Sequence, residues 1–210
     1  WKITAKETDD FDYDESKFIQ VQNRFIVCNV KKGLMVVDQN LAHFRIKYED
    51  ILGRLKSSTQ HSQQQLFPQN INLTKNDGEI LKSLFEELKN IGFEIEDAGK
   101  GNFVIVGVPA DLKDTNIPSV IESIIENHKS NVDELDFDKN INIAKSIAIR
   151  SAIKNGIKLD KREMKEIFDS LFKCKAPTVS PDGKNILRTI GESELEQILK
   201  KSKRLVPFGL

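Results

Sequence analysis

The side chains that most often carry out chemistry are few in this chain and lie far apart in sequence. The three histidines are His43, His61 and His128, and the two cysteines are Cys28 and Cys174. Neither cysteine has a second cysteine or a histidine at the spacing of zinc ligands, and we expect the histidines to be ordinary surface or boundary residues. Glycine-rich phosphate loops, the GxSxG nucleophile motif and the HExxH zinc motif do not occur. The sequence therefore predicts neither a resident metal nor a generic active site.

Charge and length restrict the class of protein. The 210 residues carry 32 basic and 32 acidic side chains, which gives a formal net charge of zero. This balance excludes a DNA clamp built on bulk positive charge and an acidic disordered tail. Without a long apolar run or a disulfide framework, we expect a cytoplasmic protein with no membrane partner. Small basic clusters are interpreted as solvated surface charge, with weak contact to DNA as the alternative: Lys31, Lys32, Lys200, Lys201, Lys203 and Arg204.

Hydrophobic periodicity predicts both strands and helices, and hence an α+β fold. The polar, acidic residues 1–17 are expected to be the end of a linker cut from a longer chain. Apolar residues at alternate positions from 18 to 27, a turn at 31–33 and an apolar run at 34–37 predict a hairpin. Apolar residues at steps of three and four then predict an amphipathic helix over 39–56.

A polar stretch over 57–65 is the expected boundary of a second subdomain. The order strand, helix, strand, strand, helix that follows predicts a small open sheet with helices on one face. Its elements are strands at 66–73, 93–96 and 103–108, a helix from Thr74 to Gly92 and a helix from Pro118. The rest of the chain predicts a helix over 141–156, a helix with a capping box at Asp160 and Glu163, a turn at Ser180–Gly183, a strand at 186–190 and a helix at 193–201.

Five blocks of the sequence, taken in order, resemble the C-terminal domain of the MutL family of DNA mismatch repair proteins. The blocks are Asn23–Val27 with Gly33–Glu49, then Gln63–Pro68, Gly92–Ile95 with Phe103–Pro109, Ala152–Leu159 and Ser180–Lys184. Together they extend from about Gln20 to Lys200, and their shared order and spacing make the resemblance specific. The resemblance implies a dimerisation subdomain made from both chain ends, 18–62 and 150–210, and an external subdomain, 63–149, inserted between them.

The resemblance also raises the question of catalysis, because in many MutL proteins this domain is a metal-dependent endonuclease. That activity depends on the motif DQHAxxExxxxE, a downstream helix cysteine and a CPHG turn. This chain keeps Asp38, Gln39 and Glu49, but Leu41 replaces the alanine, and the ligand positions hold Asn40, Phe44, Ile149, Ser180 and Asp182. Zinc needs imidazole, thiolate or carboxylate ligands, and Asp182 alone cannot hold a tetrahedral site. We therefore expect no metal and no catalytic residue among the degenerate positions Asp38, Asn40, Phe44 and Glu49.

Each of these positions also has a structural interpretation. Asp38 is expected to cap the helix that follows it, and Phe44 lies on the apolar stripe of that helix. Glu49 is expected on the exposed side of the helix, paired with a nearby lysine. The alternative is a metal-dependent endonuclease with a rearranged site of Asp38, Glu49 and Asp182, since Mg²⁺ and Mn²⁺ accept oxygen ligands.

The block Gln63–Pro68 is similar to the segment with which family members dock onto the replication sliding clamp. In such a peptide the amide of Gln63 bonds to backbone groups, Leu66 and Phe67 fill an apolar pocket, and Pro68 limits the unbound conformations. The alternative is a polar loop that leads into an ordinary strand, with Leu66 or Phe67 buried in its own domain.

The resemblance as a whole implies a homodimerising module of DNA mismatch repair. It implies the mismatch recognition protein MutS and the sliding clamp as partners, and a bacterial cytoplasm, near the nucleoid. No cofactor is expected for this part of the chain; ATP and Mg²⁺ are implied for the family's N-terminal ATPase domain. A further alternative, besides the dimerisation module and the endonuclease, is a generic α+β regulatory or peptide-binding domain that resembles MutL in fold only. We expect a dimer built on the apolar blocks 18–37 and 186–199, burying on the order of 2,000 Å².

Overall fold

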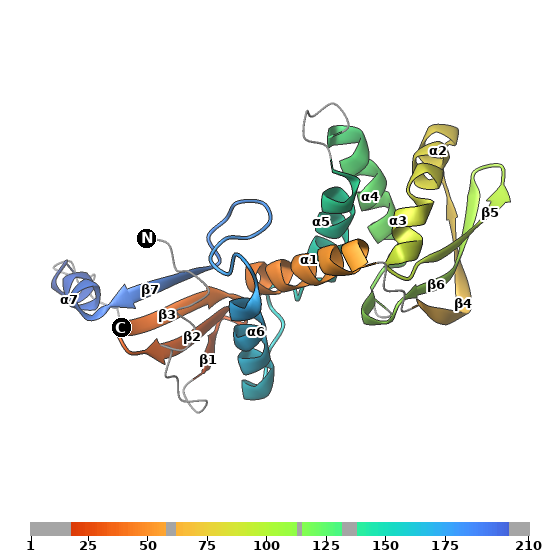
Figure 1. Ribbon diagram of the computed structural model, residues 1–210. Coiled ribbons are helices and arrows are strands. Elements are labelled where there is room, and N and C mark those ends of the chain that lie inside the picture. Colours follow the sequence, from red (N-terminus) through yellow and green to blue (C-terminus); the bar gives the residue numbers. More distant parts are fainter. Residues whose placement is uncertain (1–17, 58–61, 113–114, 132–137, 202–210) are drawn as a thin grey trace, which may run out of the picture. The chain divides into compact units, whose positions relative to one another are not determined.

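The computed structural model describes residues 18–57, 62–112, 115–131 and 138–201 (Figure 1). Helices and two antiparallel sheets make up these residues, which confirms the α+β class. The chain divides into two compact units. Among the described residues, the first unit holds 18–43 and 153–201, and the second holds the residues from Phe44 to Ala152.

The first unit is built on a four-stranded antiparallel sheet. Its strand order is β1 (Ile19–Val21), β2 (Phe25–Val30), β3 (Gly33–Asp38) and β7 (Leu187–Gly191). Strand β3 pairs with β7 from Gly33↔Gly191 to Val37↔Leu187, so the two ends of the chain form one sheet. The unit also contains helix α6 (Lys161–Lys173) and helix α7 (Glu192–Lys201).

The alternating apolar residues over 18–27, expected to lie on one side of a hairpin that turns at 31–33, fall on two strands in the structure. The backbone turns at Gln22 and Asn23, which have φ values of 51° and 48°, and the Arg24 N–H donates to the Val21 carbonyl at 3.1 Å. Strand β1 thereby folds back onto β2, a hairpin before the expected one at 31–33. The alternating pattern continues across this turn because Ile19 pairs with Val27 on the same face of the sheet.

Helix α6 starts as expected from its capping box. The Asp160 carboxylate accepts from the Glu163 N–H at 2.8 Å, and the Glu163 carboxylate accepts from the Asp160 N–H at 2.7 Å. The pair satisfies two backbone donors at the start of the helix. Phe168 of α6 contacts Phe18 edge to face, with ring centroids 5.3 Å apart, and so fixes the entry of the chain into β1.

The second unit contains the sheet order β4–β6–β5, all antiparallel. Helices α2, α3 and α4 cover one face of this sheet, as expected (Figure 1). The elements are β4 (Ser62–Asn72), α2 (Lys75–Ser83), α3 (Phe85–Asn90), β5 (Glu94–Gly99), β6 (Asn102–Pro109), a short 3₁₀ helix (Ala110–Leu112), α4 (Ile117–Asn131) and α5 (Lys139–Ser151). Aliphatic and phenylalanine side chains from all these layers form one buried core.

Two helix boundaries differ from the expectation. The single helix to Gly92 is divided at Leu84, whose side chain stays buried and keeps the apolar stripe intact across the break. Helix α5 ends at Ser151 rather than Gly156, because Ala152 takes an extended backbone with ψ of 143°. The residues up to Gly156 therefore leave the helix early and enter the first unit.

Helix α1 (Gln39–Ser57) belongs to both units. Its bounds agree with the expected 39–56, and residues up to His43 group with the first unit whereas Phe44 and those after it group with the second. The expected division, 18–62 and 150–210 against 63–149, places the whole helix in the dimerisation subdomain. That assignment of roles stays a prediction, and the expected linker 1–17 lies outside the described residues.

Candidate functional site: the β3–α1 junction and the apolar sheet face

Asp38 ends β3 and caps α1. One oxygen of its carboxylate, Oδ1, accepts from the backbone N–H groups of Asn40 at 3.0 Å and Leu41 at 3.1 Å. The other, Oδ2, lies 3.1 Å from Nε of Arg24, and the Asp38 side chain is only 9% exposed. The predicted cap is confirmed, and both oxygens of the carboxylate are engaged inside the protein.

Asn40 occupies the motif position where nicking family members have a histidine. Its side-chain amide donates to the carbonyl of Ile153 at 2.7 Å, and Nδ1 of His43, one turn further along α1, accepts from the N–H of Ile153 at 2.9 Å. Both polar groups of Ile153 are thus held by α1 at the point where the chain re-enters the first unit. Asn40 therefore links the first turn of α1 to the backbone at Ile153.

Gln39, the second residue of the motif, holds three backbone segments together. It is fully buried, and its Nε2 lies 3.0–3.1 Å from the carbonyl oxygens of Asn23, Lys154 and Ile157. Its Oε1 accepts from the side-chain amide of Gln20 at 2.6 Å. Both the oxygen and the nitrogen of this buried amide are therefore hydrogen-bonded inside the protein. Sequence reasoning assigned it no role, because its partners lie 16 to 118 residues away along the chain, beyond the reach of any local pattern.

Two further motif positions lie on the part of α1 that belongs to the second unit. Phe44 is 2% exposed and belongs to the core cluster, which confirms the expectation of core packing. Glu49 is half-buried and pairs with Arg45 at 3.6 Å, one turn before it on the helix. Glu49 is thus less exposed than the expected exposed side of the helix implies, and this ion pair is with an arginine rather than the expected lysine. An arginine at this spacing reaches the carboxylate along the helix face.

The turn Ser180–Gly183 forms as expected and uses its own polar groups. The Ser180 hydroxyl donates to the Asp182 carboxylate and accepts from the Lys184 N–H at 3.0 Å. The ammonium of Lys184 lies 2.9 Å from the other Asp182 oxygen. Burial opposes ionisation of Asp182, but the bonds from Lys184 and Ser180 outweigh it and lower the pKa of Asp182 below its ordinary value. The carboxylate is ionised and internally neutralised.

The arrangement gives no support for a metal centre in the described part of the chain. Ile149, at the position of the family's helix cysteine, is an aliphatic side chain that is 44% exposed. Within residues 18–57, 62–112, 115–131 and 138–201, no three side chains among histidine, cysteine, aspartate and glutamate converge to hold an ion. Each carboxylate of the rearranged-site alternative instead has a basic partner: Arg24 for Asp38, Arg45 for Glu49 and Lys184 for Asp182.

The sheet of the first unit has one buried face and one apolar face that is only partly covered. Ile26, Cys28, Met35 and Val37 are buried. The opposite face carries the cross-strand row Ile19, Val27 and Val36, and beside it the pair Val21 and Phe25. Ile19 is 62% exposed, Val21 is 44% exposed, and the other three are half-buried. These five side chains form a partly exposed apolar face on strands β1, β2 and β3.

The segment similar to a clamp-docking peptide lies in β4, an edge strand of the second unit. Gln63 pairs with Val108 of β6, and the pairing then shifts in register between Gln64 and Gln69. Pro68, which has no N–H to donate, lies in this irregular stretch and is exposed. The side chains of Gln63, Leu66 and Phe67 lie outside the described residues.

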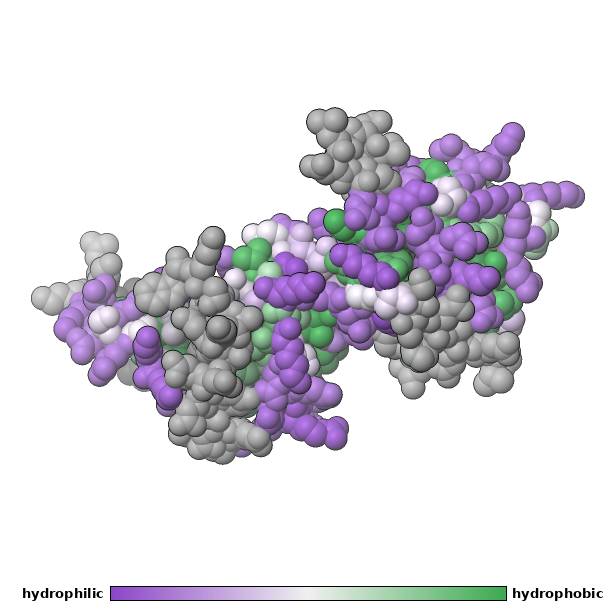
Figure 2. Space-filling model, viewed as in Figure 1, coloured by the Kyte–Doolittle hydropathy of each residue, from purple (hydrophilic) through white to green (hydrophobic). Residues whose placement is uncertain are grey.

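The basic clusters singled out in the sequence lie partly within the described residues. Lys31 and Lys32 form the β2–β3 turn, and Lys200 pairs with Glu196 at 3.0 Å. Lys203 and Arg204 lie outside the described residues. Hydrophilic residues make up most of the coloured surface in the view of Figure 2. Among the described helices, none combines the length and apolar character that crossing a membrane requires.

Comparison with known proteins decides the family. The family described as "MutL C terminal dimerisation domain" matches residues 18–159. The chain belongs to the MutL C-terminal dimerisation-domain family. It is 35% identical over 188 residues to the DNA mismatch repair protein MutL of Chlorobaculum parvum, covering 90% of this chain and 30% of that protein. The corresponding MutL proteins of Chlorobaculum tepidum and Prosthecochloris aestuarii are each 34% identical, over 90% and 88% of this chain.

The chain corresponds to only part of a MutL protein. The chain spans about 30% of the length of the curated MutL relatives that it matches. The match over 18–159 includes the β3–α1 junction and the β4–β6–β5 sheet, and so covers the second unit and strands β1 to β3 of the first unit. The resemblance seen in the five sequence blocks is confirmed at the level of the family.

Proposed function

We propose that this chain is the homodimerising module of a mismatch repair MutL protein and that it joins two copies through the apolar face of the β1–β2–β3–β7 sheet. The observation that carries the proposal is the contiguous row Ile19, Val27 and Val36, with Val21 and Phe25 beside it. In a symmetric dimer this patch of one copy packs against the same patch of the other copy, as in isologous interfaces. Because this face supplies most of the interface, we expect on the order of 2,000 Å² to be buried.

The test is a pair of substitutions on opposite faces of the same sheet. Val27→Glu places a carboxylate within the apolar row, whereas Thr189→Glu places one at an exposed position of β7, whose neighbour Met35 belongs to the other face. Size-exclusion chromatography with light scattering should give a monomer for Val27→Glu and a dimer for Thr189→Glu, because an unpaired charge in an apolar interface costs several kcal/mol. Equal masses for the two variants would refute the assignment of the interface.

We further propose that this module does not nick DNA. The proposal is supported by the structural contacts of the degenerate positions. Asp38 caps α1, the Asn40 amide donates to the Ile153 carbonyl, and Phe44 packs in a core. Supercoiled plasmid incubated with Mn²⁺ should stay intact, and stoichiometric metal should be missing from the purified protein. Nicking that disappears in Asp38→Asn would instead establish the rearranged carboxylate endonuclease.

The segment Gln63–Pro68 supports a second proposal, a weak docking of the sliding clamp. It lies on an edge strand with Pro68 exposed and with its ladder interrupted after Gln64, so part of its backbone is available to a partner. One amide anchor and two apolar side chains should give a dissociation constant of roughly 10 µM to 1 mM. A titration of the organism's clamp with the wild type and with Gln63→Ala plus Pro68→Ala, at matched melting temperatures, tests it. Equal binding by the two proteins would remove the clamp role.

The activities of the whole protein lie beyond this chain. We propose, from the family, that an N-terminal ATPase domain with ATP and Mg²⁺ precedes this module, that MutS recruits the dimer, and that the protein works in the bacterial cytoplasm with only weak contact to DNA. The net charge of zero supports the weak DNA contact, because affinity for the phosphate backbone depends on basic side chains.

A further inference from the structure

The chain leaves the second unit through an irregular segment, Ile153–Leu159, which we term the return segment. It is neither helix nor strand, and the residues from Lys154 to Lys158 are exposed. Its backbone is nevertheless held at both ends by hydrogen bonds from other parts of the first unit. Between Lys154 and Lys158 the return segment is therefore fixed by polar contacts rather than by burial.

The two ends of the return segment are held by different elements. At its start, the Ile153 N–H donates to Nδ1 of His43 on α1 at 2.9 Å. At its end, the side chain of Gln20 in β1 donates to the Ile157 carbonyl at 2.8 Å and accepts from the Leu159 N–H at 3.0 Å. The first half of the segment thus depends on α1, and the second half depends on β1.

Strand β1 carries part of the proposed dimer face on its other side. It is a three-residue edge strand in which Ile19 and Val21 lie on the open apolar face and are largely exposed. Gln20, between them, lies on the opposite face, because it pairs with the buried Ile26 of β2. In a single chain β1 therefore buries little of its apolar surface, and a second copy that covers this face adds to the stability of its pairing with β2.

We propose that β1 couples dimerisation to the anchoring of the return segment, so that the second half of this segment opens less often in the dimer than in the monomer. The inference rests on the proposed dimer face. Covering the apolar side chains of β1 stabilises its pairing with β2, and paired β1 places the Gln20 amide against Ile157 and Leu159. Such a coupling is reciprocal, so the anchoring of the return segment also strengthens the dimer.

Amide hydrogen exchange of the ¹⁵N-labelled 210-residue chain measures the coupling. Val36→Glu places a carboxylate in the apolar face on β3, which β2 separates from β1, and should give a monomer by light scattering. In that monomer the Leu159 amide should exchange at least about tenfold faster than in the wild-type dimer, because it bonds to β1. The Ile153 amide, held by α1, should keep its rate. Thr189→Glu, at the exposed position on β7, should stay a dimer with wild-type rates for both amides.

A second pair of variants tests the coupling from the return segment toward the dimer. Gln20→Met removes the polar bonds of β1 to this segment with little change in side-chain volume, whereas Asn40→Ala removes the bond from α1 to the Ile153 carbonyl. Gln20→Met should raise the dissociation constant of the dimer at least about fivefold in sedimentation, whereas Asn40→Ala should leave it unchanged.

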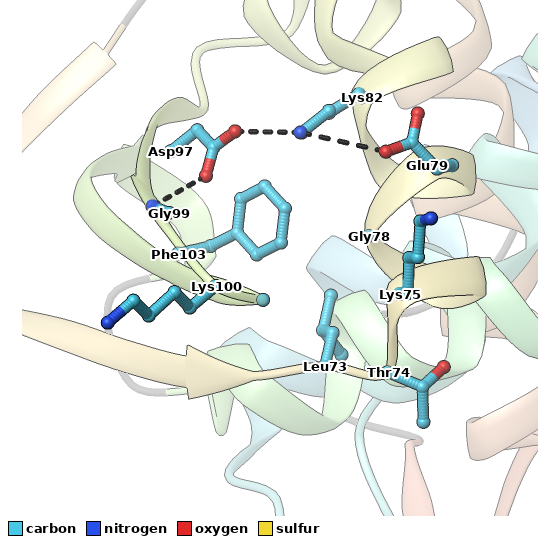
Figure 3. Close-up of a pocket in the computed structure, with 11 residues that line it drawn as sticks. Leu73, Thr74, Lys75, Gly78, Glu79, Lys82, Asp97, Gly99, Lys100 and Phe103 are labelled. Carbon is cyan, nitrogen blue, oxygen red and sulfur yellow. Dashed lines mark hydrogen bonds and ion pairs between the residues drawn. The ribbon is translucent and has the colours of Figure 1, made fainter.

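An amide of the second unit serves as the reference for overall folding. The Leu73 N–H donates to the Gly101 carbonyl at 2.8 Å, beside a pocket of about 340 Å³ between α2 and the β5–β6 hairpin (Figure 3). The residues that line this pocket all belong to the second unit. Exchange of the Leu73 amide should therefore be the same in all four variants.

The outcomes separate this inference from the dimer face on which it rests. If Val36→Glu stays a dimer, the dimer face is wrong and the coupling is refuted with it. A monomer in which Leu159 exchanges at the wild-type rate, or in which Leu159 and Ile153 accelerate alike, would overturn the coupling and leave the dimer face standing. If Val36→Glu does not fold, the comparison of Gln20→Met with Asn40→Ala decides, and equal dissociation constants for these two variants would overturn the coupling.

Discussion

Restoring the acidic residue of the nicking motif at position 44 should unfold the second unit rather than recover a site. Phe44 is 2% exposed and packs in the core cluster with Ile51 and Leu55. Removing a buried phenylalanine costs about 3–5 kcal/mol, and a carboxylate without a partner in the same space adds at least about 1–3 kcal/mol. The sum approaches the total stability of a typical domain, about 5–15 kcal/mol.

Urea unfolding followed by circular dichroism measures this effect. Phe44→Glu should lose the helical signal of the second unit at low urea, whereas Phe44→Leu should cost only about 1–2 kcal/mol because it keeps the apolar contact. Gly53→Glu places the same carboxylate on an open part of the same helix, where a Cβ meets no atom within 4 Å, and should change stability by less than about 1 kcal/mol. A folded Phe44→Glu destabilised by under about 1.5 kcal/mol would refute the claim that this position has become a core position.

Three smaller predictions concern other parts of the fold. Gly53→Ala should stabilise the protein by about 0.5–1 kcal/mol in urea unfolding, because this helical glycine has open space for a methyl group. Burial raises the pKa of Cys28 to about 11, so only ~0.1% is thiolate at pH 8, and iodoacetamide should modify it after unfolding but not before, as mass spectrometry would show. Because the pKa of Asp182 is lowered in the folded protein, its carboxylate stabilises the fold above the ordinary carboxyl pKa, and this stabilisation is lost as the pH falls through the lowered pKa. Melting temperatures of Asp182→Asn should therefore depend less on pH in the acid range below the ordinary carboxyl pKa than those of the wild type.

Local signals in the sequence predicted the parts of the fold whose causes are local. The Asp38 cap, the Asp160–Glu163 capping box and the Ser180 turn depend on bonds between residues two to four apart. The bounds of α1 follow from one apolar stripe and one cap. The hairpin at Gln22 escaped detection because pairing across it keeps Ile19 and Val27 on one face, as a continuous strand also would.

Hydrogen bonds between residues far apart in sequence organise the β3–α1 junction, so no local pattern predicts them. Gln39 bonds to Lys154 and Ile157, and Asn40 bonds to Ile153, all across separations above 100 residues. The family resemblance marked these positions as part of a degenerate endonuclease motif, but their partners in this chain follow only from its return to the first unit after α5. A glutamine directly after a capping aspartate is the signal that the sequence offers, and it identifies no partner.

Sedimentation equilibrium of the unmodified chain tests the central claim, that this is a dimerisation module, most directly. The account predicts a mass of twice the 23.9 kDa of one chain at low micromolar concentration, since an interface of about 2,000 Å² is of the size found in stable dimers. A single-chain mass of 23.9 kDa persisting at tens of micromolar protein would contradict it.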